Sequence, residues 1–239
     1  MFLPLGVLGT FLLNNFLRET YISKKSRLEE SLENFLDKKV DLGNYSGIRF
    51  LGISLGESKI IDNKNIDSEI KAKNVYVGIM PFRSFLNQKW IFKIRPEQTE
   101  ININIDFFKR DKTFKKEINK NKSNFKYELN FNLNKYSVFK LKNSGLKTKV
   151  KGNLIYKSSK RQIIANVKSD FDGKGFLKFK FNTNLNQDFL RLSLFSRGLD
   201  LENSEYIIGN RKISFKKGNF KSNFKFNKLL TGTSCKGRF

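Results

Sequence analysis

Apolar and polar residues alternate with a period of two through most of the chain after residue 40. The clearest stretch places Ile101, Ile103 and Ile105 on one side, with Asn102 and Asn104 between them. Strict alternation is typical of strands that have one apolar face and one polar face. Two later segments repeat it, with Tyr127, Leu129, Phe131 and Leu133 in the first, and Phe179 and Phe181 in the second. The pattern predicts a mainly β protein.

The first 17 residues have a different pattern, because nearly all of them are apolar. Asn14 and Asn15 interrupt the run, and basic residues follow from Arg18 to Arg27. An apolar segment that ends in basic residues is typical of a membrane anchor, although a spanning helix needs about 20 residues. The apolar positions are Phe2, Leu3, Leu5, Val7, Leu8, Phe11, Leu12, Leu13, Phe16 and Leu17.

Two other interpretations fit this segment less well than a membrane anchor. A cleaved signal peptide would need a positive start and a small-residue cleavage site, and the sequence has neither. A buried core helix would normally keep one polar face, whereas this segment is apolar nearly all round. We therefore predict that residues 1–23 form a single-pass membrane anchor.

A short amphipathic helix is expected over residues 24–39. Ser26 and Glu29 have the spacing of a capping box, which marks a helix start. The apolar stripe that follows should pack against the sheet or lie on a bilayer; it contains Leu28, Leu32, Phe35 and Leu36.

Composition favours a folded chain without an evident catalytic centre. The sequence has 25 Phe, 7 Tyr and 3 Pro, which suits a sheet with buried surface and not a disordered chain. It has no His and one cysteine, Cys235, so neither a Ser–His pairing nor a zinc-ligand spacing is available. We expect no enzyme activity, no metal and no cofactor.

The formal net charge of +25 admits two interpretations. A basic chain with interleaved aromatic residues is typical of nucleic-acid binders. Here the lysines are spread from Lys24 to Lys236 along the polar faces of alternating segments. We therefore favour a solvated face that also meets anionic lipid headgroups, and expect no specific nucleic-acid partner. A basic module that binds nucleic acid or another anionic polymer is the alternative function.

The order of motifs in the first 105 residues resembles a known family. The expected helix ends over residues 32–38 and is followed by Val40, Leu42 and Gly43. The segment from Gly47 to Ile60 comes next. Next come a strand over Val75–Val77, a turn from Pro81 to Leu86, and Arg95–Pro96 before Ile101. In this order the motifs resemble the N-terminal part of TamB and AsmA-like proteins (translocation and assembly module, bridge-like lipid transfer), in particular the cyanobacterial and chloroplast-envelope branch.

The resemblance implies a function. It implies an inner-membrane protein with its β region in the periplasm (intermembrane space), which carries phospholipid acyl chains along an apolar groove or assists outer-membrane protein assembly and secretion. It also implies an outer-membrane barrel protein of the assembly family as a partner, reached through a C-terminal part that this chain lacks. The groove candidates are Ile101, Ile103, Ile105, Tyr127, Leu129, Phe131, Leu133, Phe179 and Phe181.

The predicted organisation after the two helical segments has four parts. They are an N-terminal β segment (40–108), a polar loop (109–124), a β groove segment (125–230) and an irregular tail (231–239). Because no strong helical pattern intervenes, we expect an elongated, curled antiparallel sheet with an open apolar groove. A closed β-sandwich is the alternative, since both architectures require one apolar face per strand.

Overall fold

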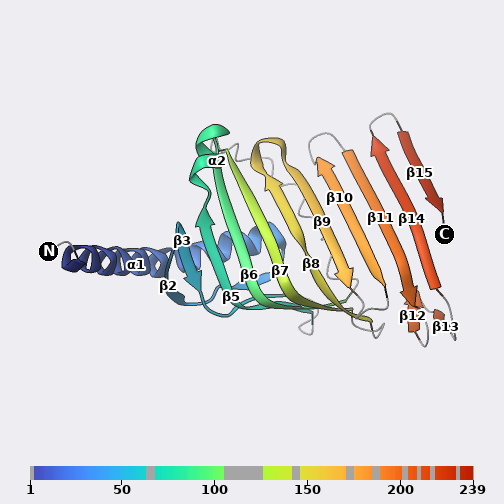
Figure 1. Ribbon diagram of the computed structural model, residues 1–239, viewed down its shortest axis with the longest axis horizontal. Coiled ribbons are helices and arrows are strands. Elements are labelled where there is room, and N and C mark those ends of the chain that lie inside the picture. Colours follow the sequence, from blue (N-terminus) through green and yellow to red (C-terminus); the bar gives the residue numbers. More distant parts are fainter. Residues whose placement is uncertain are drawn as a thin grey trace.

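The computed structural model places one long helix against a broad sheet (Figure 1). It describes residues 3–62, 68–104, 126–141, 146–170, 175–184, 189–200, 204–208, 211–215, 219–229 and 232–238. The helices are α1 (Leu3–Leu36) and α2 (Pro81–Leu86), with a 3₁₀ turn η3 (Ser158–Lys160). The predicted mainly β architecture is confirmed.

Six strands precede the predicted polar loop (residues 109–124). They are β1 (Lys39–Asp41), β2 (Tyr45–Arg49), β3 (Gly52–Leu55), β4 (Ser58–Ile61), β5 (Glu69–Ile79) and β6 (Trp90–Ile103). Those after it are β7 (Tyr127–Leu141), β8 (Leu146–Lys157), β9 (Gln162–Asp170), β10 (Phe176–Asn184), β11 (Phe189–Asp200), β12 (Ser204–Ile208), β13 (Arg211–Phe215), β14 (Asn219–Leu229) and β15 (Gly232–Arg238).

Thirteen of these strands form one sheet, and β12 and β13 form a separate hairpin. The order is β1-β4-β5-β6-β7-β8-β9-β10-β11-β14-β15, with β3 also pairing with β5 and β2 with β3. Figure 1 shows β5 to β11, β14 and β15 side by side in a single layer. Within the described part of the chain the strands therefore do not divide into two large packed sheets.

The pairing of β6 with β7 corrects the expectation of a purely antiparallel sheet. These two strands are parallel, with Trp90 beside Tyr127 and Ile103 beside Leu141, whereas every other described pair is antiparallel. Parallel neighbours require a connection of a dozen or more residues that returns the chain to its starting end. The predicted polar loop, residues 109–124, falls in this connection and lies outside the described residues.

The helix α1 is continuous from Leu3 to Leu36, so the prediction of a separate helix beginning at Ser26 is wrong. Extending an existing helix by one residue costs less than nucleating a new one, and no Pro or Gly interrupts residues 10–36. Of the apolar stripe expected to pack against the sheet or lie on a bilayer, Leu28 is exposed and is not covered by the sheet.

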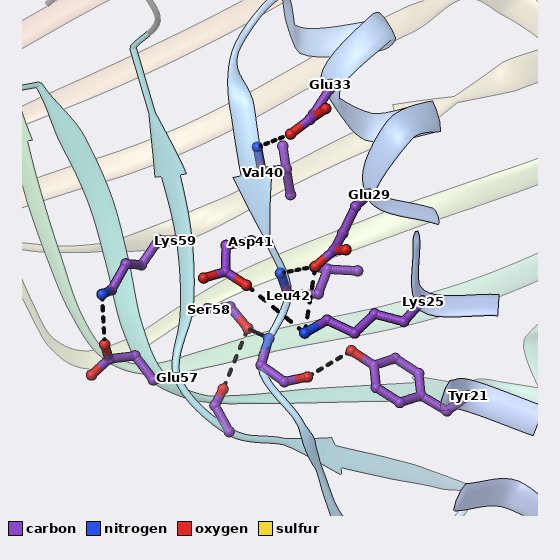
Figure 2. A network of polar contacts seen from close by, with 12 residues as sticks. Tyr21, Lys25, Glu29, Glu33, Val40, Asp41, Leu42, Glu57, Ser58 and Lys59 are labelled. Atoms are coloured by element: carbon purple, nitrogen blue, oxygen red, sulfur yellow. Dashed lines mark hydrogen bonds and ion pairs between the residues drawn. The ribbon is translucent and has the colours of Figure 1, made fainter. Parts of the chain in front are cut away.

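A polar stripe of α1 contacts the sheet edge (Figure 2). The Glu33 carboxylate accepts a hydrogen bond from the Val40 N–H at 2.9 Å, and the Glu29 carboxylate accepts one from the Leu42 N–H at 2.8 Å. Lys25 lies 3.6 Å from Glu29 and 3.9 Å from Asp41. Glu29 thus satisfies the backbone amide of Leu42, just after β1, and does not cap the helix.

Two further contacts fasten earlier parts of α1 to the same segment. The Tyr21 hydroxyl donates to the Gly43 carbonyl at 2.6 Å, and the Gly43 N–H donates to Ser58 Oγ at 2.9 Å. The Tyr45 hydroxyl donates to Asn14 Oδ1 at 2.8 Å. Tyr21 is only 7% exposed, so the last turns of the predicted anchor, residues 1–23, also contact the β segment, and the end of the anchor at residue 23 stays a prediction.

The N-terminal half of α1 projects beyond the sheet in Figure 1. Phe11, Leu12, Leu13 and Phe16 are exposed on it. No helix in the described residues is long and apolar enough to cross a membrane. Membrane attachment of this segment stays a prediction.

The C-terminal tail is a strand, so the prediction of an irregular segment is wrong for Gly232–Arg238. This strand, β15, pairs with β14 from Leu229 opposite Gly232 to Asn223 opposite Arg238. An edge strand needs only backbone pairing on one side, and small or polar residues such as Gly, Thr and Ser can supply it without apolar alternation.

A buried ion pair joins the end of α1 to the end of β4. Lys38 Nζ lies 3.1 Å from Asp62 Oδ1, and both side chains are buried. We expect Lys38→Met to lower the free energy of unfolding by about 3–5 kcal/mol, because it removes the cation that compensates the buried carboxylate. Urea unfolding measures this loss. The double variant Lys38→Met/Asp62→Leu should recover most of it, and an equal loss in both variants would contradict this account.

Tyr21 should make stability depend on alkaline pH. Burial, together with Glu29 and Asp41, raises the pKa of Tyr21 to about 12 from an ordinary value of 10.0. The unfolded chain therefore releases this proton at lower pH than the folded protein. The protonated Tyr21 hydroxyl therefore contributes roughly 2 kcal/mol to the free energy of unfolding. This contribution is fully present below pH 10 and is lost as pH rises toward about 12. Unfolding of Tyr21→Phe over the same range should show a smaller decline, and parallel curves would argue against the assignment.

Candidate functional site

Cross-strand pairing brings the apolar positions of consecutive strands onto one face of the sheet, here called face A. Directly paired residues in neighbouring strands point to the same side. One row begins at Ile94 in β6 and passes through Phe131 in β7. It continues across five more strands through Leu154, Ala165, Phe181, Leu192 and Phe226.

Two flanking rows run in the same direction. The first begins at Phe92 in β6 and passes through Leu129, Tyr156, Ile163, Thr183 and Leu190. The second begins at Leu133 in β7 and passes through Gly152, Val167, Phe179, Leu194 and Phe224. Face A is therefore built of rows that cross the strands, each row about 6.6 Å from the next.

Face A stays apolar in the second half of β6 because the alternation shifts there. Glu97 and Gln98 are consecutive exposed residues, and Gln98 has a left-handed φ of 47°. After them Ile101 pairs with Phe139 and Ile103 with Leu141, which are on the same face as Leu129 according to their partners in β8. The predicted groove residues Ile101 and Ile103 thus belong to the same surface as Ile94 in the first half of β6.

Face A is only partly covered in the described structure. Tyr127, Leu129, Phe131, Phe179 and Phe181 are half-buried, and so are Leu133 and Ile101. Ile103 is the exception, at 1% exposed. Ile105 lies outside the described residues. Of the predicted groove residues, all eight described ones therefore share face A.

A row of small polar side chains lies beside the apolar rows. Ser137 pairs with Val150, which pairs with Ser169, and Ser196 pairs with Ser222. The four serines are buried, and the hydroxyls of Ser196 and Ser222 lie 3.0 Å apart.

The opposite face, face B, carries a row of lysines beside apolar residues such as Ile155 and Ile164, which pair with each other. Lys151 in β8, Lys168 in β9 and Lys178 in β10 are directly paired across three strands, and all three are exposed. We call these three residues the lysine ladder. Among the described residues no carboxylate lies within ion-pair distance of the ladder. Like charges directly opposite one another are destabilising.

A second like-charge pair shows how such repulsion is compensated elsewhere. Lys59 and Lys71 are also direct partners, in β4 and β5. The Glu57 carboxylate lies 3.0 Å from both ammonium groups. Hydrogen bonds from Lys71 and Lys59 hold the pKa of Glu57 below its ordinary value. The Glu57 carboxylate therefore lies between Lys59 and Lys71. On the lysine ladder an anionic ligand could take the corresponding position.

Sequence reasoning missed two parts of the site. It did not identify β8, whose alternating Val150, Leu154 and Tyr156 are diluted by lysine, asparagine and glycine. It also left Phe92 and Ile94 out of the groove set, although the alternation of β6 marks them as clearly as Ile101. The described residues contain no group of three or more acidic, His or Cys side chains that could hold a metal.

Comparison with known proteins adds no assignment. No protein-family model matches the chain, and no match to a curated protein was found.

Proposed function

We propose that this protein is the inner-membrane-attached part of an envelope-spanning bridge of the TamB/AsmA-like type, which carries phospholipid acyl chains along face A or serves outer-membrane protein assembly. The observation that carries the proposal is the continuity of the apolar rows from β6 to β14. Neighbouring strands lie about 4.8 Å apart, so seven strands span roughly 29 Å. An extended acyl chain fits within that distance.

Transfer of apolar area from water would drive binding to this face. Each buried methylene contributes about 0.8 kcal/mol, so a chain of ordinary length would gain roughly 10 kcal/mol. Because the rows repeat with similar side chains, neighbouring positions along the path would have similar free energies. An acyl chain could then slide between them without a large barrier, and face A would act as an open groove.

Membrane attachment is proposed for the N-terminal half of α1. Its exposed side chains include Phe11, Leu12, Leu13 and Phe16. The β region would lie in the periplasm, since a long domain can be translocated regardless of nearby basic residues. An outer-membrane barrel protein of the assembly family would be the partner at the far end of the bridge.

Leu129→Arg should separate an open apolar face from a closed core. On an open face the guanidinium reaches water, so the fold should survive while lipid binding is lost. In a closed core the substitution would instead bury an unpaired charge, which costs several kcal/mol. The total free energy of unfolding of a protein is only about 5–15 kcal/mol. The measurements are circular dichroism during thermal unfolding and lipid photocrosslinking from a probe at Phe131.

Asn132→Arg provides the matched control, because Asn132 lies on face B of the same strand. It adds the same charge and should leave crosslinking unchanged. Cooperative loss of structure in Leu129→Arg, together with no crosslink in the parent protein, would remove the transfer mechanism. Crosslinking that persists in a folded Leu129→Arg would also contradict the proposed path.

A second candidate function, binding of nucleic acid or another anionic polymer, is favoured by the lysine ladder. If the ladder is only a solvated face, nucleic-acid binding should be weak and disappear between about 50 and 200 mM salt. Gel shifts over this range measure it. Lys151→Gln/Lys168→Gln/Lys178→Gln should then weaken binding no more than the charge-matched control Lys24→Gln/Lys39→Gln/Lys73→Gln. Tight, salt-tolerant binding that only the ladder variant abolishes would favour the second function.

A further inference from the structure

The short helix α2 turns its apolar side away from the protein. Phe82, Phe85 and Leu86 are spaced i, i+3 and i+4, so they share one side of the helix. They are 85%, 85% and 79% exposed. Ser84 faces the sheet instead, since its Oγ accepts the Ile91 N–H at 2.9 Å. An amphipathic segment of a water-soluble surface would have the reverse arrangement.

Other exposed apolar side chains lie at the same end of the sheet. Phe50 and Leu51 form the turn between β2 and β3, and Phe50 is 88% exposed. The Leu51 carbonyl accepts the Ile79 N–H at 2.9 Å, which places this turn beside the start of α2. Trp90, at the start of β6 just after α2, is 48% exposed. Figure 1 shows α2 at the extremity of β5 and β6.

Hydrogen bonds also place the start of β7 and the turn η3, which follows β8, at this end of the sheet. The Trp90 N–H donates to the Lys126 carbonyl at 3.1 Å, and the Tyr127 N–H donates to Ser158 Oγ at 2.8 Å. We define the α2 end as residues 49–51, 80–90, 126–128 and 157–161.

The α2 end is strongly cationic as well as apolar. It contains seven basic residues and one acidic residue, Glu128, a net charge of +6. Burial alone would raise the pKa of Glu128, but the hydrogen bond and charge of Lys89 outweigh it and hold the value below its ordinary range. Glu128 therefore stays ionised and neutralises Lys89. The basic residues are Arg49, Arg83, Lys89, Lys126, Lys157, Lys160 and Arg161.

We propose that the α2 end docks on the surface of an anionic lipid bilayer, with Phe50, Phe82 and Phe85 inserted among the acyl chains and the surrounding cations at the headgroups. Exposed aromatic residues ringed by Lys and Arg match both layers of such a surface. Each cation near an anionic bilayer strengthens binding by about fivefold. A protein partner with an apolar pocket would not by itself account for the excess of six positive charges.

Trp90 supplies a local reporter for the test, because it is the single tryptophan of the chain. The full-length protein is mixed with vesicles of phosphatidylcholine alone or with phosphatidylglycerol added. Docking should shift Trp90 emission to shorter wavelength in the anionic vesicles. Phospholipids brominated on the acyl chains should quench it, and high salt should weaken both effects.

The variant Phe82→Ser/Phe85→Ser should lower the partition coefficient reported by Trp90 at least tenfold, since burying each aromatic side chain contributes substantially to insertion. Phe195→Ser is the matched control. Phe195 is also exposed, but it lies on face B in β11, away from the α2 end. It should behave like the parent protein. Cosedimentation of the protein with the vesicles is measured separately, because the N-terminal half of α1 is itself proposed to attach to membranes. We expect cosedimentation to persist in all variants.

Unchanged, unquenched Trp90 emission in protein that cosediments with anionic vesicles would overturn the proposal. Concentration-dependent self-association in the parent protein that Phe82→Ser/Phe85→Ser abolishes would overturn it too, in favour of a second copy as the occupant. The proposal does not rest on acyl-chain transfer along face A. Loss of crosslinking at Phe131 with normal Trp90 quenching would contradict transfer alone, and the converse result would contradict docking alone.

Discussion

The register of the parallel pair β6–β7 is the constraint on which the rest of the sheet depends. This pair joins the strands that precede residue 105 to those that follow residue 125. Side chains alternate with a period of two, so a slip of one residue would turn the whole apolar set of one half to the opposite side. The observed register places Ile94 beside Phe131 and Ile101 beside Phe139. Both pairings lie on face A only because Gln98 adopts a left-handed conformation between them.

The sequence allowed the faces of individual strands to be predicted, because alternation is a local property. Spacing alone assigns Tyr127, Leu129 and Phe131 to one face, and the register places them there, Tyr127 opposite Trp90 in β6 and the other two opposite residues of β8. Parallel pairing could not be predicted in this way, since it depends on which strands meet and not on the residues within either. The long helix was missed for a related reason: a capping box at Ser26 is a local signal, whereas continuation depends on the helix that already precedes it.

The positive charge has a more definite arrangement than its spread along the sequence suggested. Alternation sends the lysines of β8, β9 and β10 to face B, and the register then aligns three of them. At Lys59 and Lys71 the protein supplies Glu57 to offset the repulsion. On the lysine ladder no carboxylate among the described residues takes that role; the Lys168 ammonium lies 4.7 Å from the centroid of the Phe176 ring, a cation–π contact, and solvent and salt screen the remaining repulsion. That arrangement suits a surface that meets a changing set of anions, including lipid headgroups.

The two proposals meet at Trp90. Its ring stacks against Phe92, with centroids 6.5 Å apart, and its direct partner in β7 is Tyr127. Trp90 therefore belongs to face A and to the α2 end at once. If the α2 end docks on a bilayer, the first apolar residues of face A come to lie at the depth of the acyl chains. A lipid could then pass from the bilayer onto face A without exposing its whole hydrocarbon chain to water, a step that would otherwise oppose transfer by about 0.8 kcal/mol for each methylene.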